Sequence, residues 1–270
     1  MIKKTKESQY SSSSEKEKVR NFLLFPLFRK IHKIAERSLT ILELIDEDLE
    51  SIRRLKIIDP WCEVIGVTFG DQDLSQNSFC IFEEKLDKLM KDNYFLDSYP
   101  TGFDFINLDF YGPGRFFDET KSWRPDLLIN VLKMQSKQKA FGLMLTVDSY
   151  DDIFPRRNHI IANGKNELDL RKALLPSIMP SIANFASTNN LEANYERLIS
   201  IAGLVKEVSL IANFSGYSIQ PFKKPVVYVG KSSGHITPMI SLGFLFLKRK
   251  KNLSDKEIIK FTKKAVFLYK

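Results

Sequence analysis

Four acidic residues stand at or just past the ends of short apolar runs, where a carboxylate could hold a polar ligand. They are Glu43, Asp71, Asp109 and Asp148. If the runs are parallel strands, their carboxyl ends meet at one edge of a sheet, and ligands bind at that edge. A single acid in such a place can instead cap a helix. Four of them at one edge favour a binding site.

The segment around Asp109 contains the most candidate residues. Its sequence is FDFINLDFYGPG, and the candidates are Asp109, Tyr111 and Gly112. Asp109 could accept a hydrogen bond from a nucleophilic nitrogen and orient it, which makes it a candidate catalytic residue. Tyr111 could stack on a base, and Gly112 would lie beside the substrate. The alternatives are an acid that caps loop amides and a tyrosine that packs over the sheet edge.

The elements that must position these residues follow from the hydrophobic pattern. Five short apolar runs alternate with amphipathic helical segments, which is typical of a parallel α/β sheet. We expect the strands at 19–25, 39–44, 63–69, 103–110 and 140–147, and the helices at 27–37, 46–55, 79–91 and 124–137. Two later runs, 225–229 and 239–247, have a connector too short for a crossover and should be antiparallel. The sequence therefore predicts a seven-stranded, Rossmann-like α/β sheet, mostly parallel with a C-terminal antiparallel strand.

The domain organisation follows from changes in composition. Residues 1–17 read as a disordered tail because they are polar and serine-rich. Residues 18–250 form the α/β domain, and 166–215 read as a helical insertion within it, broken by prolines. This insertion could cover the sheet, act as a lid or hold a protein partner. Residues 251–270 read as a basic C-terminal helix.

Charge is concentrated at the two ends of the chain. The net charge is +8, yet residues 1–37 alone carry +6 and residues 221–270 carry +10, so the middle is acidic. Lys248 and Arg249, and the pair Arg156 and Arg157, are candidate contacts to a phosphate backbone, which such clusters favour through counterion release. A solvated lysine surface is the alternative reading.

Several classes are excluded. Two cysteines and three scattered histidines do not make a metal site, so no metal is expected. No apolar run is long enough to span a membrane, and the charged N-terminus lacks a signal-peptide core. We expect a cytoplasmic protein with no membrane partner. Neither a phosphate-binding GxxxxGK[ST] loop nor a hydrolase nucleophile elbow occurs.

A parallel sheet that ends in an antiparallel hairpin, with acids at its strand ends, resembles the class I S-adenosylmethionine-dependent methyltransferases over residues 19–250. The resemblance implies the strand order 3-2-1-4-5-7-6, with the last strand antiparallel. The resemblance implies that Glu43, ending the second strand, holds the ribose of S-adenosylmethionine and that Asp71, after the third, contacts the adenine amine. It places Asp109 and the residues after it beside the methyl group and the substrate. That string is similar to the Asp-Pro-Phe-Gly motif of some RNA guanine methyltransferases.

The chain departs from this family at the first motif. The turn expected after the first strand, Leu24 to Phe28, has no glycine, so Phe25 and Pro26 would contact the cofactor's methionine end. Two functions follow. One is a methyltransferase that uses S-adenosylmethionine and acts on nucleic acid. The other is a catalytically inactive, methyltransferase-like subunit that binds nucleic acid or a protein partner within a larger complex.

Overall fold

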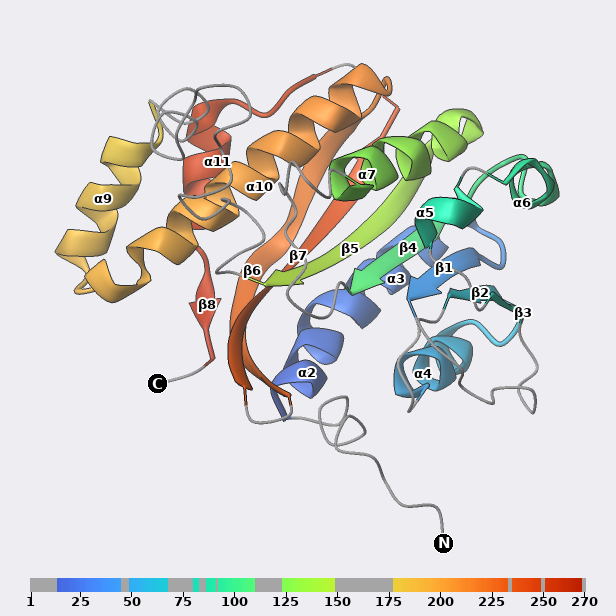
Figure 1. Ribbon diagram of the computed structural model, residues 1–270, viewed down its shortest axis with the longest axis horizontal. Coiled ribbons are helices and arrows are strands. Elements are labelled where there is room, and N and C mark those ends of the chain that lie inside the picture. Colours follow the sequence, from blue (N-terminus) through green and yellow to red (C-terminus); the bar gives the residue numbers. More distant parts are fainter. Residues whose placement is uncertain are drawn as a thin grey trace, which may run out of the picture.

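The computed structural model describes most of the chain and arranges it in three layers (Figure 1). The described residues are 14–44, 49–67, 80–82, 86–90, 92–109, 123–148, 177–232, 235–248 and 251–268. A central sheet is covered on both faces by helices, and each face has its own hydrophobic core. None of the helices within these ranges is long and apolar enough to cross a membrane.

The sheet has the strand order β3-β2-β1-β4-β5-β7-β6-β8. Its strands are β1 (Thr40–Leu44), β2 (Glu63–Val67), β3 (Cys80–Phe82), β4 (Phe105–Asp109), β5 (Ala140–Asp148), β6 (Ser218–Ser232), β7 (His235–Leu247) and β8 (Val266–Phe267). Strand β7 is antiparallel to both of its neighbours, and the other pairs are parallel. The predicted order of seven strands is confirmed, and with it the class I methyltransferase fold. Strand β8 adds a short eighth strand beside β6.

Two groups of helices cover the two faces. One face is covered by α2 (Ser14–Val19), the π-helical turn η1 (Arg20–Leu24), α3 (Phe25–Ala35) and α4 (Glu50–Ile58). The other is covered by α5 (Leu86–Leu89), α6 (Asn93–Ser98), α7 (Trp123–Met134), α9 (Met179–Thr188), α10 (Tyr195–Phe214) and α11 (Asp255–Thr262). Short 3-10 turns, η3 (Gln135–Lys137) and η5 (Glu192–Asn194), lie before β5 and α10. Helix α10 lies in the second half of the segment expected to be a helical insertion.

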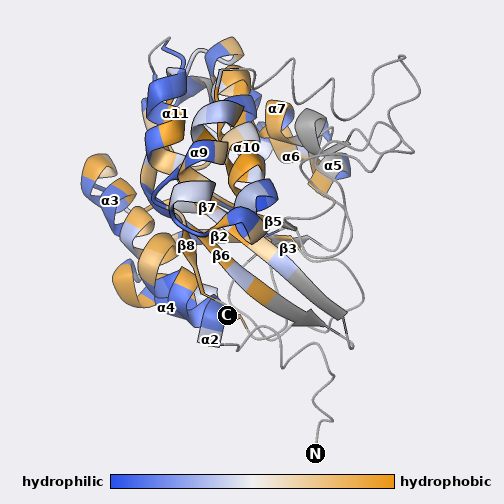
Figure 2. Ribbon diagram, turned by 90° about the vertical axis from the view of Figure 1, so that its left-hand side faces the viewer, coloured by the Kyte–Doolittle hydropathy of each residue, from blue (hydrophilic) through white to orange (hydrophobic). Residues whose placement is uncertain are grey.

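The prediction of a strand at 19–25 is wrong, because this segment belongs to a continuous helical run from α2 through η1 to α3. Its buried side chains recur at helical spacing along one face: Val19, Leu23, Leu24, Leu27, Phe28 and Ile31. Hydrophilic and hydrophobic residues alternate along α3 as this spacing requires (Figure 2). Pro26 lies in the first turn of α3, where a missing N–H costs nothing.

The strand numbering therefore shifts by one. The runs expected as strands two and three are β1 and β2, and the third strand is β3, which lies inside the predicted helix 79–91. Strand β3 has only three residues and pairs with β2 at the edge of the sheet. Three residues are too few for a hydrophobic pattern that would predict a strand. The predicted final helix ends at Thr262, and the chain then forms β8.

The expected tail is also too long. Helix α2 begins at Ser14, inside the segment predicted to be disordered. A polar helix of six residues is not stable alone. It forms here as the first part of the helical run that continues through η1 to α3, and its Lys16 and Glu17 pair with charged residues from other parts of the chain.

Candidate functional site

A row of polar side chains crosses the sheet at the carboxyl ends of the parallel strands. On β4 the side chains that face α2 and α3 change from the buried Phe105 to Asn107 and Asp109. On β1 they change in the same way, from Ile41 to Glu43. Burying polar groups costs free energy unless they are paired. A row of them at the ligand-binding edge of such a sheet therefore points to a site.

Hydrogen bonds link this row from strand to strand. Asn107 Nδ2 donates to Glu43 Oε1 at 2.7 Å, and both residues are buried. Thr146 on β5 and Ser241 on β7 share a hydrogen bond between their hydroxyls at 2.8 Å. Asp109 pairs in register with Thr146, and its Oδ1 is buried with no hydrogen-bond partner among the described residues. This oxygen is placed to accept a hydrogen bond from a bound group.

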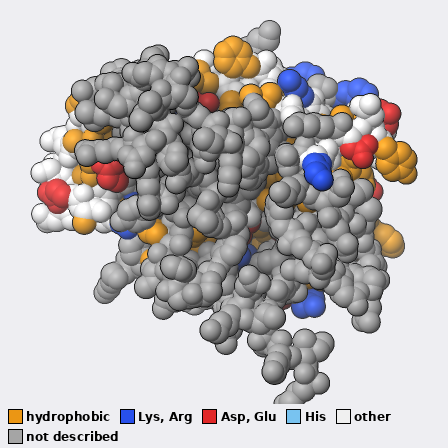
Figure 3. Space-filling model, viewed as in Figure 1, with side chains coloured by type: hydrophobic (Ala, Val, Ile, Leu, Met, Phe, Trp, Pro, Cys, Tyr) orange, Lys and Arg blue, Asp and Glu red, His pale blue; other side chains and the backbone are white. Residues whose placement is uncertain are grey.

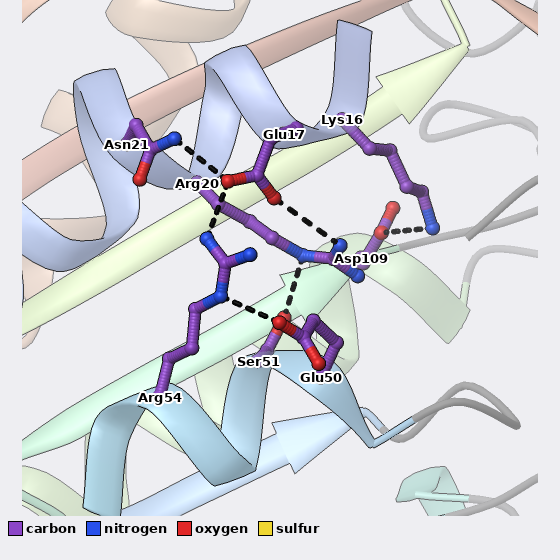
Figure 4. Close-up of polar contacts among 8 residues, drawn as sticks. All are labelled: Lys16, Glu17, Arg20, Asn21, Glu50, Ser51, Arg54 and Asp109. Atoms are coloured by element: carbon purple, nitrogen blue, oxygen red, sulfur yellow. Dashed lines mark hydrogen bonds and ion pairs between the residues drawn. The ribbon is translucent and has the colours of Figure 1, made fainter. Parts of the chain in front are cut away.

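Helix α2 and the turn after it lie across these strand ends (Figure 4). Lys16 Nζ lies 3.2 Å from Asp109 Oδ2, and the lysine side chain is 9% exposed. Arg20 Nε donates to Ser51 Oγ at 3.0 Å, which connects η1 to the first turn of α4. The N-terminal segment therefore closes the site from one side through charged and polar contacts, while its apolar side chains Val19, Leu23 and Leu24 are buried against the sheet.

A second set of charges fastens this segment to α4. Arg54 pairs with Glu17, and Arg54 Nε donates to Glu50 Oε1 at 2.6 Å. Asn21 Nδ2 also donates to Glu17, at 2.7 Å. Burial alone would raise the pKa of Glu17, but hydrogen bonds from Arg54 and Asn21 and the nearby positive charges lower it below its ordinary value. Glu17 therefore stays ionised as the pH falls towards its ordinary pKa of 4.5.

Between these groups lies a small cavity of about 30 Å³. Lys16, Arg20, Glu43, Asn107 and Asp109 supply most of its polar lining, and Met144 and Tyr228 are among its apolar neighbours. A volume of this size holds about one water molecule. A nucleoside-sized ligand needs more room, so it must lie further along the strand ends or displace α2.

The structure locates only part of the predicted site. Asp109 and Glu43 line the same cavity, as expected for acids at one edge. Lys248 is exposed at the opposite end of the sheet, because its neighbour Leu247 pairs with the first residue of β5. Six predicted site residues lie outside the described residues: Asp71, Tyr111, Gly112, Arg156, Arg157 and Arg249.

Two assignments made with the strand numbering need correction. Glu43 ends the first strand of the sheet, not the second, so it does not stand where the second-strand acid would hold the ribose. Phe25 and Pro26 begin helix α3 and are not a turn after a strand. Phe25 is buried, with the Arg54 guanidinium 5.8 Å from its ring centroid, and does not line the cavity. The residues that follow β1 are Ile45 to Asp48, also without a glycine.

Sequence reasoning missed Lys16, Arg20 and Asn107. Asn107 stands two residues before Asp109, and strand alternation alone puts both on the same face. Lys16 and Arg20 had no comparable signal, because they reach the site only through tertiary contacts. Among the described residues, no group of histidine, cysteine and acidic side chains is arranged to hold a metal ion.

Comparison with known proteins gives fold-level likenesses only. No protein-family profile and no curated protein matches the chain. It is similar to a solved plantazolicin methyltransferase in complex with a desmethyl analogue and SAH, at 9% identity over 89% of each chain with a TM-score of 0.49. It is also similar to Trm1 from Pyrococcus horikoshii in complex with S-adenosyl-L-methionine, at 10% identity over 87% of this chain and 56% of that one, with a TM-score of 0.40.

A third similar structure is a SAM-dependent methyltransferase from Archaeoglobus fulgidus, at 12% identity over 90% of this chain and 97% of that one, with a TM-score of 0.40. Likenesses this weak assign no role to any residue. The fold rests on the strand order and on the single antiparallel strand.

Proposed function

We propose that this chain is a methyltransferase that uses S-adenosylmethionine and methylates an amino group of nucleic acid. The observation that carries the proposal is Asp109. It ends β4 in a sheet of methyltransferase order, and its buried Oδ1 has no hydrogen-bond partner among the described residues. In such a sheet this edge is where ligands bind.

Two acidic residues at the strand ends fit the binding of such a cofactor. The carboxylates of Glu43 and Asp109 place hydrogen-bond acceptors at the strand ends, while Lys16 and Arg20 in the same cavity balance their charge. When bound, S-adenosylmethionine supplies a methyl group on that sulfur, and transfer forms a nitrogen–carbon bond while the sulfur–carbon bond breaks and the nitrogen releases a proton. Asp109 Oδ1 would accept a hydrogen bond from the acceptor's N–H and so aim the nitrogen lone pair. Asn107 would hold Glu43 in place through the 2.7 Å hydrogen bond.

Nucleic acid is our preferred acceptor because of charge. The excess of lysine and arginine lies at the two ends of the chain, and part of the N-terminal excess is carried by the exposed side of α3. A polyanion that binds such a surface gains affinity by releasing counterions. The predicted contacts Arg156, Arg157, Lys248 and Arg249 stay part of this proposal, as do cofactor binding by Asp71 and substrate contact by Tyr111 and Gly112.

A specific observation favours the second candidate, a catalytically inactive subunit. Lys16 already pairs with Asp109 Oδ2, and the residues after β1 contain no glycine to let a cofactor approach the backbone. In this case the fold and the basic surfaces would serve to hold nucleic acid or a protein partner. The two candidates differ in one property, since the inactive subunit transfers no methyl group.

A transfer assay tests the proposal. The full chain is incubated with tritium-labelled S-adenosylmethionine and, separately, with total RNA, single-stranded DNA, duplex DNA and a protein extract. We expect label in at least one nucleic-acid sample, and unlabelled S-adenosylhomocysteine should suppress it. Label in the protein extract alone would contradict the nucleic-acid target. No label in any sample would favour the inactive subunit.

A further inference from the structure

The side of α3 that faces solvent carries a shallow groove bordered by positive charge. The groove is wide open to solvent and is lined by Arg29, His32, Lys33, Glu36, Arg37 and Ser38. Arg29 and Lys33 are exposed and lie four residues apart, so they share one face of α3. The exposed Arg37 lies just beyond the helix, which ends at Ala35. Glu36 is the one acid of this lining. The Asp104 carboxylate accepts two hydrogen bonds from Arg37, at 2.7 and 2.8 Å, so Arg29 and Lys33 provide the uncompensated charge.

A second basic cluster lies beside the start of the same helical run. Lys223 Nζ lies 4.9 Å and Lys224 Nζ 5.4 Å from the centroid of the Phe22 ring. Two ammonium groups over one ring repel each other, and an anion between them would relieve that repulsion. Lys223 adopts a left-handed backbone conformation with φ of 54°, at the point where the pairing of β6 with β7 shifts register. The bulge presents both lysines on the side of η1.

An exposed aromatic ring lies beside the groove. Trp61, just after α4, is 85% exposed. Its backbone N–H donates to Asp59 Oδ1 at 3.2 Å, and the other oxygen of Asp59 lies 3.8 Å from Nε2 of His32, which lines the groove. A tryptophan left in water beside basic side chains offers a stacking face for an unpaired base.

Together these features form a track that crosses the outer side of the helical run, from Lys223 and Lys224 on β6 to Trp61 after α4. From Phe22 to Lys33 the helix rises about 17 Å, which is a span of several nucleotides. The face seen in Figure 3 differs, because the lysine and arginine side chains of its described surface are scattered among acidic and hydrophobic ones. The track leads from the N-terminal edge of the sheet towards α2, which covers Asp109.

We propose that this track, made of Arg29, Lys33, Lys223, Lys224 and Trp61, binds the backbone and an unpaired base of single-stranded nucleic acid. Lysine and arginine side chains contact the phosphates, and Trp61 stacks on a base. The exposed Trp61 ring favours a partner with unpaired bases, because the bases of a duplex are not free to stack. The inference rests on the proposed function for its choice of substrate, but the binding itself needs no cofactor.

The test is a fluorescence anisotropy titration without cofactor. Full-length protein is titrated into a labelled single-stranded RNA of about 20 nucleotides, into the matching duplex, and at two salt concentrations. The double variant Arg29→Glu/Lys33→Glu should bind single strands about tenfold more weakly or worse. It should also lose about 1.4 units of the slope of log affinity against log salt, for two phosphate contacts. Trp61→Ala should remove the preference for single strands over the duplex.

The matched control is Lys133→Glu/Lys137→Glu, which changes the net charge equally on α7 and η3, outside the two basic ends of the chain, where both lysines are exposed. It should bind within about twofold of the unaltered chain. Equal weakening in both double variants would overturn the track, because general charge would then explain binding. So would unaltered protein that binds anionic lipid vesicles but no RNA. Either result leaves methyl transfer, measured separately, as the test of the proposed function.

Discussion

Replacing Asp109 with asparagine should lower the rate of methyl transfer by roughly two orders of magnitude, while S-adenosylmethionine still binds. The asparagine keeps the shape of the side chain but gives up the charge that pairs with Lys16. It also weakens the acceptor that would orient the nucleophilic nitrogen through the buried Oδ1. The measurement is single-turnover transfer of a tritiated methyl group, together with a calorimetric titration of the cofactor.

The control for this variant is Asp97→Asn, which removes the same charge from an exposed position on α6 and should leave transfer unchanged. If Asp109→Asn transfers methyl groups as fast as the unaltered chain, Asp109 does not orient the acceptor. If the variant loses cofactor binding and transfer together, Asp109 supports the cofactor instead.

Replacing Phe28 with alanine should lower the free energy of unfolding by about 3–5 kcal/mol. Phe28 is fully buried in α3, and its ring packs edge-to-face against Phe105 of β4, with the centroids 5.4 Å apart. Truncating it leaves a cavity between the helix and the centre of the sheet. Urea unfolding followed by circular dichroism measures the change.

The same substitution at Phe214 is the matched control. This phenylalanine is 88% exposed at the end of α10, so Phe214→Ala should change stability by less than about 0.5 kcal/mol. A small effect at both positions would mean that α3 does not pack against the sheet as described.

The sequence predicted the sheet order correctly although it placed the first strand wrongly. An apolar run such as 19–25 can be a buried strand or a buried helix, and a short window does not separate them. Extending the window to Ile31 reveals the helical spacing of Leu23, Leu27 and Ile31. Strand β3 was not predicted, because it lies inside a segment predicted as a helix. One strand was therefore predicted in excess and one was missed, so the number of strands before the fourth, and with it the numbered order, stayed correct.

The site was predictable where strand geometry decides it. Parallel strands end at one edge, so Glu43 and Asp109 were expected together, and both line the cavity. Lys16 and Arg20 could not be found this way, because they reach the site through single polar contacts to distant residues, which leave no pattern in the sequence. The ordinal of a strand also decides the role of its terminal acid. Because the strand numbering shifts by one, Glu43 loses the ribose-binding role assigned to a second-strand acid, although it still lies at the site.

The central claim is that the strand ends bind S-adenosylmethionine, and calorimetric titration of the full chain with this cofactor tests it most directly. We predict saturable binding of one molecule per chain, with a dissociation constant between about 1 μM and 1 mM. Glu43→Gln keeps an oxygen that can accept the hydrogen bond from Asn107 but removes the charge. It should weaken binding about tenfold or more, as expected for loss of a charge-assisted contact. Absence of saturable heat up to about 1 mM cofactor, in protein that is folded by circular dichroism, would contradict the claim.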